Sequence, residues 1–242
     1  MTRLNDIPLA QLQFYLTSPY PCSYLPERIA RSQVATPAHL VDTAAYGELI
    51  RAGFRRSGSF TYRPLCGDCN ACVPVRVVTD EFIPNRTQRR AMKRNAMLSV
   101  SIRAPYFDSE HFDLYQRYQA ARHAGGGMDR DDRDQYAHFL VASHVDTYLL
   151  VFREGDQLQM ISIVDSVADG LSAVYTFFNP DLPARSFGVF NVLWQIDLAR
   201  QLQLPYLYLG YWVDGSRKMV YKQQYKPLQG LIDGNWRTCS AA

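Results

Sequence analysis

The sequence lacks features that would place the chain in a membrane or outside the cell. No apolar run approaches the roughly 20 residues that a membrane helix needs. The first ten residues, M-T-R-L-N-D-I-P-L-A, hold no apolar stretch of signal-peptide length. The five cysteines are an odd number and three are bunched, unlike a secreted disulfide framework. We therefore expect a cytoplasmic protein in a reducing environment, without membrane contact.

Repeats and low-complexity tracts are also missing from the sequence. A hydrophobic content of 47% in 242 residues is ample for one large core or two smaller ones. The net charge of +3 implies little by itself, but basic residues are concentrated between Arg51 and Arg94. Such a block on a nearly neutral chain is typical of a surface that binds phosphates, although it also fits an ordinary solvated face.

The order of the predicted elements indicates an α+β fold. Apolar alternation predicts strands at 60–63, 73–78, 98–103, 148–153, 158–165, 171–178 and 205–212. Helical patterns cover 85–97, 136–141 and 186–202, and begin near Asp108 and Ser216. The later part resembles the order of the N-acetyltransferase (GNAT) fold. We predict a small Cys-containing basic domain, 1–95, followed by a GNAT-like domain, 96–242.

The stretch L-C-G-D-C-N-A-C-V-P places three cysteines at a spacing of three residues. A tetrahedral zinc site or an iron–sulfur cluster needs a fourth ligand, and Cys22 lies upstream in a loop constrained by prolines. The candidate metal ligands are therefore Cys22, Cys66, Cys69 and Cys72. The alternative is a set of reduced thiols that bind nothing. Pro74 in the following strand predicts a strand edge or a strand start.

The predicted helix at 85–97 carries a basic face. Its cations, spaced so that they share one broad helix face, are the candidate RNA-binding residues Arg86, Arg89, Arg90, Lys93 and Arg94. A face of this kind binds a nucleic acid backbone by releasing counterions. The alternative is an ordinary charged surface.

A second group of cations and aromatics follows the last long strand, in Y-L-Y-L-G-Y-W-V-D-G-S-R-K-M-V-Y-K-Q-Q-Y. On a helix, Lys218 and Lys222 are one turn apart, as are Tyr221 and Tyr225. This pattern suits stacking on a terminal base, or capture of a carboxylate, or simply core packing. The candidate substrate-binding residues are Arg55, Arg56, Arg185, Tyr211, Lys218, Tyr221 and Lys222.

A glycine-rich turn is absent before the helix at 186–202. The turn R-S-F-G-V-F has one glycine and bulky neighbours, which disfavours close approach of a coenzyme A pyrophosphate. No Cys/His or Ser/His/Asp arrangement suggests a catalytic triad, so we assign no catalytic residue. A donor other than coenzyme A, with some other activated acyl group, fits these absences.

Long motifs resemble the aminoacyl-tRNA–protein transferases, on the bacterial side of that family. They include P-Y-P-C-S-Y-L-P, G-F-R-R-S-G-S-F-T-Y-R-P, C-G-D-C-N-A-C-V-P-V-R-V and S-R-K-M-V-Y-K-Q-Q-Y-K-P. The resemblance implies transfer of leucine from leucyl-tRNA to the α-amine of proteins that begin with Asp or Glu, which creates a degradation signal. It implies no required cofactor, although related eukaryotic enzymes carry metal- or cluster-binding cysteines in their N-terminal domain.

The acceptor's carboxylate needs a cation, and Arg55 and Arg56 are the first candidates, with Lys218 and Lys222 as rivals. Two other functions stay open at this point. One is a metal-containing module that binds tRNA without turnover, and the other is a coenzyme A-dependent N-acetyltransferase.

Overall fold

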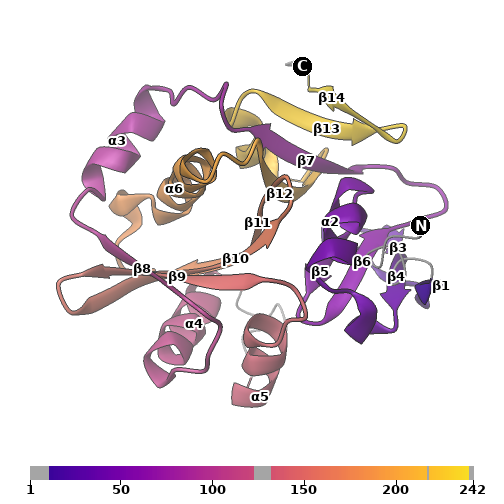
Figure 1. Ribbon diagram of the computed structural model, residues 1–242, viewed down its shortest axis with the longest axis horizontal. Coiled ribbons are helices and arrows are strands. Elements are labelled where there is room, and N and C mark those ends of the chain that lie inside the picture. Colours follow the sequence, from indigo (N-terminus) through magenta and orange to yellow (C-terminus); the bar gives the residue numbers. More distant parts are fainter. Residues whose placement is uncertain (1–10, 123–131, 217, 240–242) are drawn as a thin grey trace, which may run out of the picture.

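Two main β-sheets and their covering helices make up the described residues, 11–122, 132–216 and 218–239, of the computed structural model (Figure 1). The smaller sheet has the strand order β1-β4-β6-β5, with bounds Gln13–Leu16, Ser32–Thr36, Phe60–Pro64 and Arg55–Ser57. Beside it lie the short pair β2 (Tyr20–Pro21) and β3 (Ile29–Ala30), the turn η2 (Ala38–Leu40) and helix α2 (Thr43–Arg51). The mixture of helices and strands in the sequence prediction is confirmed.

The larger sheet has eight strands in the order β14-β13-β7-β12-β11-β10-β9-β8. Their bounds are Asn235–Thr238, Leu228–Ile232, Cys72–Val78, Tyr206–Val213, Gly170–Phe178, Gln157–Val167, Thr147–Glu154 and Ser99–Arg103. The predicted meander at 148–178 is confirmed as β9, β10 and β11, because its apolar strands are buried and joined by short turns.

The only parallel pairing that joins these eight strands is short. Strand β11 pairs with β12 through Gly170–Ser172 and Tyr206–Tyr208, and no register pair follows. The helix α6 (Phe187–Gln201) connects the two strands. Beyond Ser172 and Tyr208 the two strands therefore separate, and we call the space between them the strand opening.

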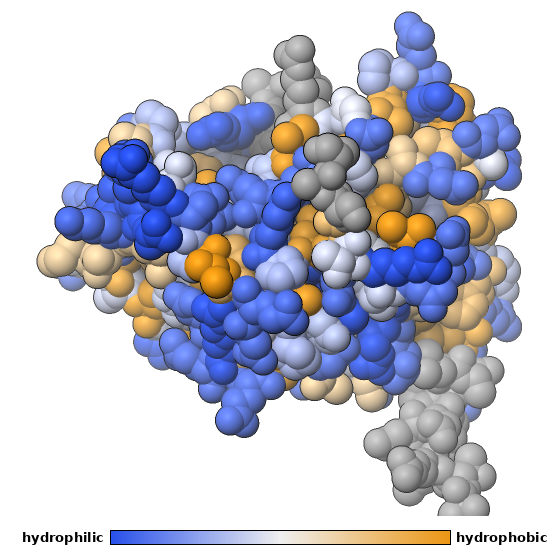
Figure 2. Space-filling view, turned by 90° about the horizontal axis from the view of Figure 1, so that it is seen from above, coloured by the Kyte–Doolittle hydropathy of each residue, from blue (hydrophilic) through white to orange (hydrophobic). Residues whose placement is uncertain are grey.

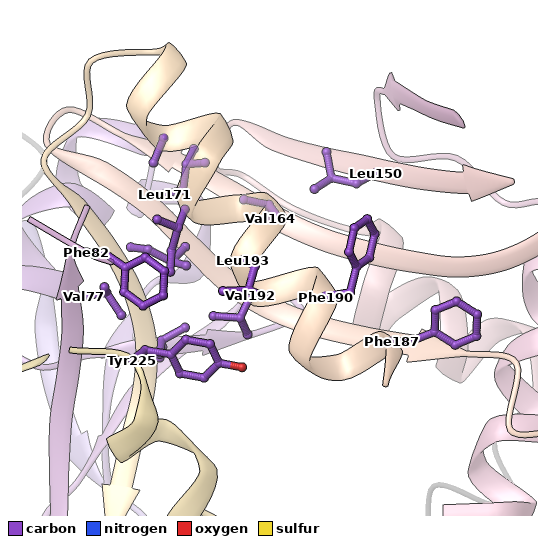
Figure 3. Packing of buried hydrophobic residues seen from close by; sticks show 14 of the residues in the cluster. Val77, Phe82, Leu150, Val164, Leu171, Phe187, Phe190, Val192, Leu193 and Tyr225 are labelled. Atoms are coloured by element: carbon purple, nitrogen blue, oxygen red, sulfur yellow. The ribbon is translucent and has the colours of Figure 1, made fainter. Parts of the chain in front are cut away.

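Helices cover both faces of the larger sheet. In Figure 1, α6 and α3 (Arg86–Arg94) lie on one face, and α4 (Ser109–Arg122) and α5 (Arg133–Tyr136) lie on the other. The π-helical turn η4 (Ala137–Val141) extends α5, while η5 (Pro183–Arg185) precedes α6 and η6 (Val220–Gln224) follows β12. Figure 3 shows the apolar cluster beneath α6, where Phe187, Phe190 and Leu193 pack toward the sheet.

Helix α3 begins at a capping box that the sequence encodes locally. Asn85 accepts a hydrogen bond from the backbone of Gln88 at 2.9 Å, and the Gln88 side chain accepts from the Asn85 backbone at 2.8 Å. Its other side packs on α6. The cap and this packing hold α3 as a helix despite its high charge.

Two local predictions need correction. Pro74 lies in an internal strand, β7, but β13 pairs only with residues 75–77 of that strand, so the proline sits beyond the β13 ladder. The helix predicted from Ser216 is only the 3₁₀ turn η6. The chain after it forms the hairpin β13–β14, which turns around Asp233 and Gly234, both with positive φ.

The predicted division near residue 95 stays a prediction. Strand β7, from the sequence assigned to the first domain, is paired inside the larger sheet between β12 and β13. Among the described residues, no helix combines the length and the apolar character that crossing a membrane requires.

Candidate functional site

Arg56, on β5 of the smaller sheet, forms an ion pair with Asp165 on β10 of the larger sheet, so its side chain is not available to a substrate. Its guanidinium donates to the Asp165 carboxylate, with Nε 2.6 Å from Oδ2, and both side chains are buried. It also donates to the Gly58 carbonyl and to Thr147 Oγ1, each at 3.0 Å. With these contacts made, its prediction as a substrate-binding residue is not supported by its geometry.

The side chain of Arg55, the residue before Arg56, reaches the strand opening instead. Its Nη2 donates to the Val174 carbonyl at 3.2 Å. Val174 has no register partner in β10, because Ile163 pairs with Tyr175 and Val164 pairs with Ala173. A β-bulge in β11 thus presents this carbonyl to Arg55.

The opposite side of Arg55 contacts Gly210 in β12. A Cβ on Gly210 would lie 2.6 Å from Arg55 Nη1, and Gly210 has φ +72°. The β12–β7 register shifts at this residue. Glycine is required here for two reasons, since a side chain would strain the backbone and displace the guanidinium. Sequence reasoning missed Gly210, although Y-L-G-Y, a glycine inside a strand pattern, was a signal for a bulge.

Lys222 and Tyr211 are brought to the same place by η6 and β12. Lys222 is 2% exposed, and its Nζ donates to the Tyr211 carbonyl. Burial, together with the positive charge of Arg55, holds the pKa of Lys222 well below its usual value. The Tyr211 hydroxyl donates to the Gly53 carbonyl at 2.9 Å, so Tyr211 supports the site and its phenol is already engaged.

The pair Arg55 and Lys222 has no internal counter-ion. Within the ranges that the structure describes, no Asp or Glu forms an ion pair with either side chain. Buried cations are normally paired, because transfer of an unpaired charge from water is costly. An anionic group from a substrate would complete this site.

The four candidate metal ligands line one cavity of about 120 Å³. The cavity walls also include Tyr24, Tyr62 and Tyr211, so the cavity lies next to the Arg55 site. All four thiols are free, and none is fully buried. Burial, and next the neighbouring thiols, raise the pKa of Cys72 to about 11.

The cysteines share this cavity without forming a metal centre. In the described part of the chain, no group of three or more Cys, His, Asp or Glu side chains is placed to hold a metal ion. Four thiolates are a suitable ligand set for zinc or an iron–sulfur cluster by their chemistry. To hold a metal, the four side chains would have to draw together within the cavity that they line.

The basic face of α3 is exposed to solvent. Its members, all exposed, are Arg86, Arg89, Arg90, Lys93 and Arg94. Figure 2 shows strongly hydrophilic residues gathered at the end of the molecule that α3 occupies in Figure 1. Arg94 Nη1 donates to the Ala184 carbonyl at 2.9 Å, which connects this face to the turn before α6. Among the described residues, no acid pairs with these cations.

The other predicted substrate-binding residues lie apart from one another. Arg185 is held by Glu154, 2.9 Å from Nη1, and by Asn95, 2.9 Å from Nε, so its guanidinium is largely used internally. Lys218 is exposed on the turn before η6, and Tyr221 is 46% exposed. The predicted helical pairing of Lys218 with Lys222 is wrong, because one is exposed and the other buried.

Two groups of cations in this structure have charges that suit an anionic ligand. An anionic group would match the charge of Arg55 and Lys222, and a phosphate backbone would match the charge of α3.

Solved structures give only a weak likeness. The structure titled "Crystal structure of FemX" aligns with 76% of this chain and 64% of that chain, at 9% identity and a TM-score of 0.46. A score this low carries no argument about fold or function.

Sequence comparisons are far stronger. The family models "Arginine-tRNA-protein transferase, N terminus" and "Arginine-tRNA-protein transferase, C terminus" match residues 20–90 and 110–232. An aspartate/glutamate leucyltransferase of Thiobacillus denitrificans is 61% identical over 237 residues, covering 98% of this chain and 99% of that protein. One of Nitrosospira multiformis is 58% identical, covering 98% and 94%. The chain therefore belongs to the arginine-tRNA–protein transferase family.

Proposed function

We propose that this protein transfers leucine from leucyl-tRNA to the α-amine of proteins that begin with Asp or Glu. The observation that carries the acceptor choice is that half-buried Arg55 and buried Lys222 lack a carboxylate partner among the described residues. Relatives with 58% and 61% identity over nearly the whole chain bear the name aspartate/glutamate leucyltransferase. The product would carry an N-terminal leucine, a degradation signal in bacteria.

The acceptor's first side chain would enter the strand opening. Its carboxylate accepts hydrogen bonds from Arg55, which presents a planar fork of donors, and receives a second positive charge from Lys222. A carboxylate beside Lys222 also offsets the two influences that lower the pKa of that amine. A neutral first residue would leave both cations unpaired and would bind more weakly.

The reaction is aminolysis of an ester and needs no cofactor in this proposal. The acceptor's nitrogen attacks the ester carbonyl carbon, and the tetrahedral intermediate then loses the ribose oxygen of the tRNA. The proton that nitrogen releases goes to that oxygen, which leaves a peptide bond and a free tRNA hydroxyl. An α-amine with a pKa of about 7.7–8.0 is partly neutral near pH 7, so positioning contributes most of the catalysis.

The tRNA would lie along α3. The exposed cations of that helix contact the phosphate backbone, and the link from Arg94 to the turn before α6 directs the acceptor end toward the strand opening. Lys218, on the turn before η6, and Tyr221, within η6, are both exposed and would contact the terminal nucleotide.

A GNAT-like arrangement is part of this proposal for residues 96–242, with a Cys-containing domain at 1–95. Supporting it are the parallel pair β11–β12, the helix α6 that connects them, and the early end of their pairing. Because β7 is paired within the larger sheet, the two parts would fold as one cooperative unit.

The cysteine cavity is the candidate site for zinc or an iron–sulfur cluster, and it would have a structural role. Metal analysis of protein purified without oxygen should find a stoichiometric metal that Cys69→Ser removes. A metal-free protein with unchanged activity would refute this assignment.

Five free thiols also fit a cytoplasmic location, where thiols stay reduced.

The decisive experiment supplies labelled leucyl-tRNA and two peptides that differ only in their first residue, Asp or Arg. We expect label on the Asp peptide alone. Tight tRNA binding with no label on either peptide would instead favour an RNA-binding module. Acetyl transfer from acetyl-coenzyme A would indicate the N-acetyltransferase alternative.

A further inference from the structure

Four polar side chains meet between α6 and the strands β10 and β11. We call them the amide–hydroxyl cluster: Ser162 on β10, Thr176 on β11, and Asn191 and Gln195 on α6. Ser162 Oγ lies 2.7 Å from Thr176 Oγ1, Asn191 Nδ2 donates to Thr176 Oγ1 at 2.9 Å, and Gln195 Nε2 donates to Ser162 Oγ at 3.0 Å. The two amides are one helical turn apart and share a face of α6.

The cluster has two spare hydrogen-bond acceptors. Asn191 is 3% exposed and Gln195 is 0% exposed, yet Asn191 Oδ1 and Gln195 Oε1 accept no hydrogen bond from any described residue. An unsatisfied buried acceptor destabilises a fold by about 1–3 kcal/mol. Apolar side chains of similar shape would pack here without this cost, so the cluster has a role other than stability.

The position of the cluster connects it to the strand opening. Thr176 is half-buried and lies beyond the last residue of β11 that pairs with β12, which is Ser172. It is two residues from Val174, whose carbonyl accepts from Arg55. Thr176 and Asn191 therefore form the end of the cluster nearest to the acceptor's site, and Gln195 forms the deep end.

The chemistry of the cluster favours a ligand that donates hydrogen bonds. Its spare groups are amide oxygens, and none of its members is charged. Leucyl-tRNA carries one group of this kind at its reactive end, the α-ammonium, which has three N–H donors. The apolar core cluster to which α6 contributes, with Leu171, Phe187 and Val192 among its members, is suited to an aliphatic side chain. A carboxylate would be repelled by the amide oxygens and is attracted instead by Arg55.

We infer that the amide–hydroxyl cluster binds the α-amino group of the leucyl residue on the donor tRNA, with Asn191 Oδ1 as the first acceptor. This inference rests on the proposed function and specifies its donor side. The cluster would thus distinguish charged from uncharged tRNA, because an uncharged 3′ end offers only hydroxyls. The bound amine is also kept from attacking another ester, which leaves the acceptor's amine as the nucleophile.

The test compares the binding of two donor analogues that cannot react. Two stable analogues are made from an acceptor-stem minihelix whose last ribose has a 3′-amide link. One analogue carries leucine, and the other carries 4-methylpentanoate, which matches leucine but lacks the amine. Inhibition of leucyl transfer by each gives its inhibition constant. We expect the leucyl analogue to bind wild-type protein about 10–100-fold more tightly, the value of hydrogen bonds to a charged donor.

Asn191→Leu keeps the side-chain shape and removes the acceptor, so the two analogues should then bind equally. Gln119→Met is the matched control, because Gln119 also has a buried, unpaired amide oxygen but lies on α4, on the other face of the sheet. It should keep the wild-type preference. If Asn191→Leu does not fold, Thr176→Val replaces it, since it removes the hydroxyl that orients Asn191.

Equal inhibition constants in the wild-type protein would overturn the inference, as would a preference that persists in Asn191→Leu. Either result leaves the proposed function intact where leucine still reaches the Asp peptide. A wild-type protein that transfers no leucine at all would refute the proposed function, and this inference with it.

Discussion

The variants Arg55→Met and Arg56→Met change adjacent residues but should impair different properties of the protein. Both replace a guanidinium by an apolar side chain of similar length. Arg56 is paired with Asp165 and buried, whereas Arg55 donates to the Val174 carbonyl and has no acidic partner in the described ranges. We therefore expect Arg56→Met to impair folding and Arg55→Met to impair acceptor recognition.

The cost of Arg56→Met follows from the carboxylate that it leaves behind. Asp165 is 0% exposed, and without Arg56 its remaining side-chain partner is Thr147. Breaking a buried ion pair on one side costs about 3–5 kcal/mol. For a chain of this length the loss corresponds to a fall in Tm of about 6–20 °C. The double variant Arg56→Met/Asp165→Leu should recover most of it, because no uncompensated charge remains.

Arg55→Met removes a cation that no internal acid neutralises, so the free energy of unfolding should change by no more than about 1 kcal/mol. Transfer to a peptide that begins with Asp should fall about 10–100-fold in kcat/KM, the loss of charge-assisted hydrogen bonds to one carboxylate. A matched peptide that begins with Ala, a poor acceptor for both proteins, should be unaffected. Arg55→Lys should recover only part of the loss, since it lacks the planar fork.

Urea unfolding and steady-state transfer with the two peptides measure these effects on the same preparations. The reasoning fails if Arg55→Met keeps the wild-type preference for Asp over Ala. It also fails if Arg56→Met unfolds at the wild-type urea concentration, since its ion pair would then contribute nothing to stability.

Three further changes test other parts of the site. Gly210→Ala should reduce both stability, by roughly 1–2 kcal/mol, and transfer to the Asp peptide, because the new Cβ strains a residue at φ +72° and meets Arg55; equal urea midpoints would contradict this. Arg89→Glu should weaken the binding of uncharged tRNA, and the slope of the logarithm of the binding constant against the logarithm of salt concentration should become shallower by roughly 0.9 per lost phosphate contact. The control Arg133→Glu, on α5 across the sheet, should change neither the binding nor the slope. Stability should fall as the pH drops below about 6.5, since burial lowers the pKa of His111 and the unfolded chain binds the proton first; His111→Gln should flatten that part of the urea-midpoint profile.

The predictions that succeeded were those that depend on local pattern. The meander β9–β11 and helix α6 carry unbroken apolar patterns of period two or near four, and α3 carries a capping box in N-R-T-Q. In each case the side chains that determine the element are within a few residues of one another. The helix predicted after Ser216 does not form, because a contact with a distant part of the chain overrides its helical spacing. Lys222 lies in the interior, where its Nζ donates to the Tyr211 carbonyl.

The roles of Arg55 and Arg56 could not be separated from the sequence. They are adjacent in β5, so successive side chains point to opposite faces of the strand. Which face meets Asp165 and which meets Gly210 depends on how the small sheet packs against the large one. That packing joins residues from distant parts of the chain, and a charge pattern read along one strand contains no information about it.

The site residues that sequence reasoning missed share one physical property: each adopts an arrangement that lowers the stability of the folded chain and gains nothing locally. Gly210 adopts a positive φ inside a strand, Val174 is bulged out of its ladder, and Asn191 leaves a buried amide oxygen unpaired. A folded chain keeps such features where another requirement outweighs stability. All three lie at or beside the strand opening, where no acid of the described residues pairs with Arg55 or Lys222. Their coincidence at one location is a stronger argument for the active site than the composition of any single motif.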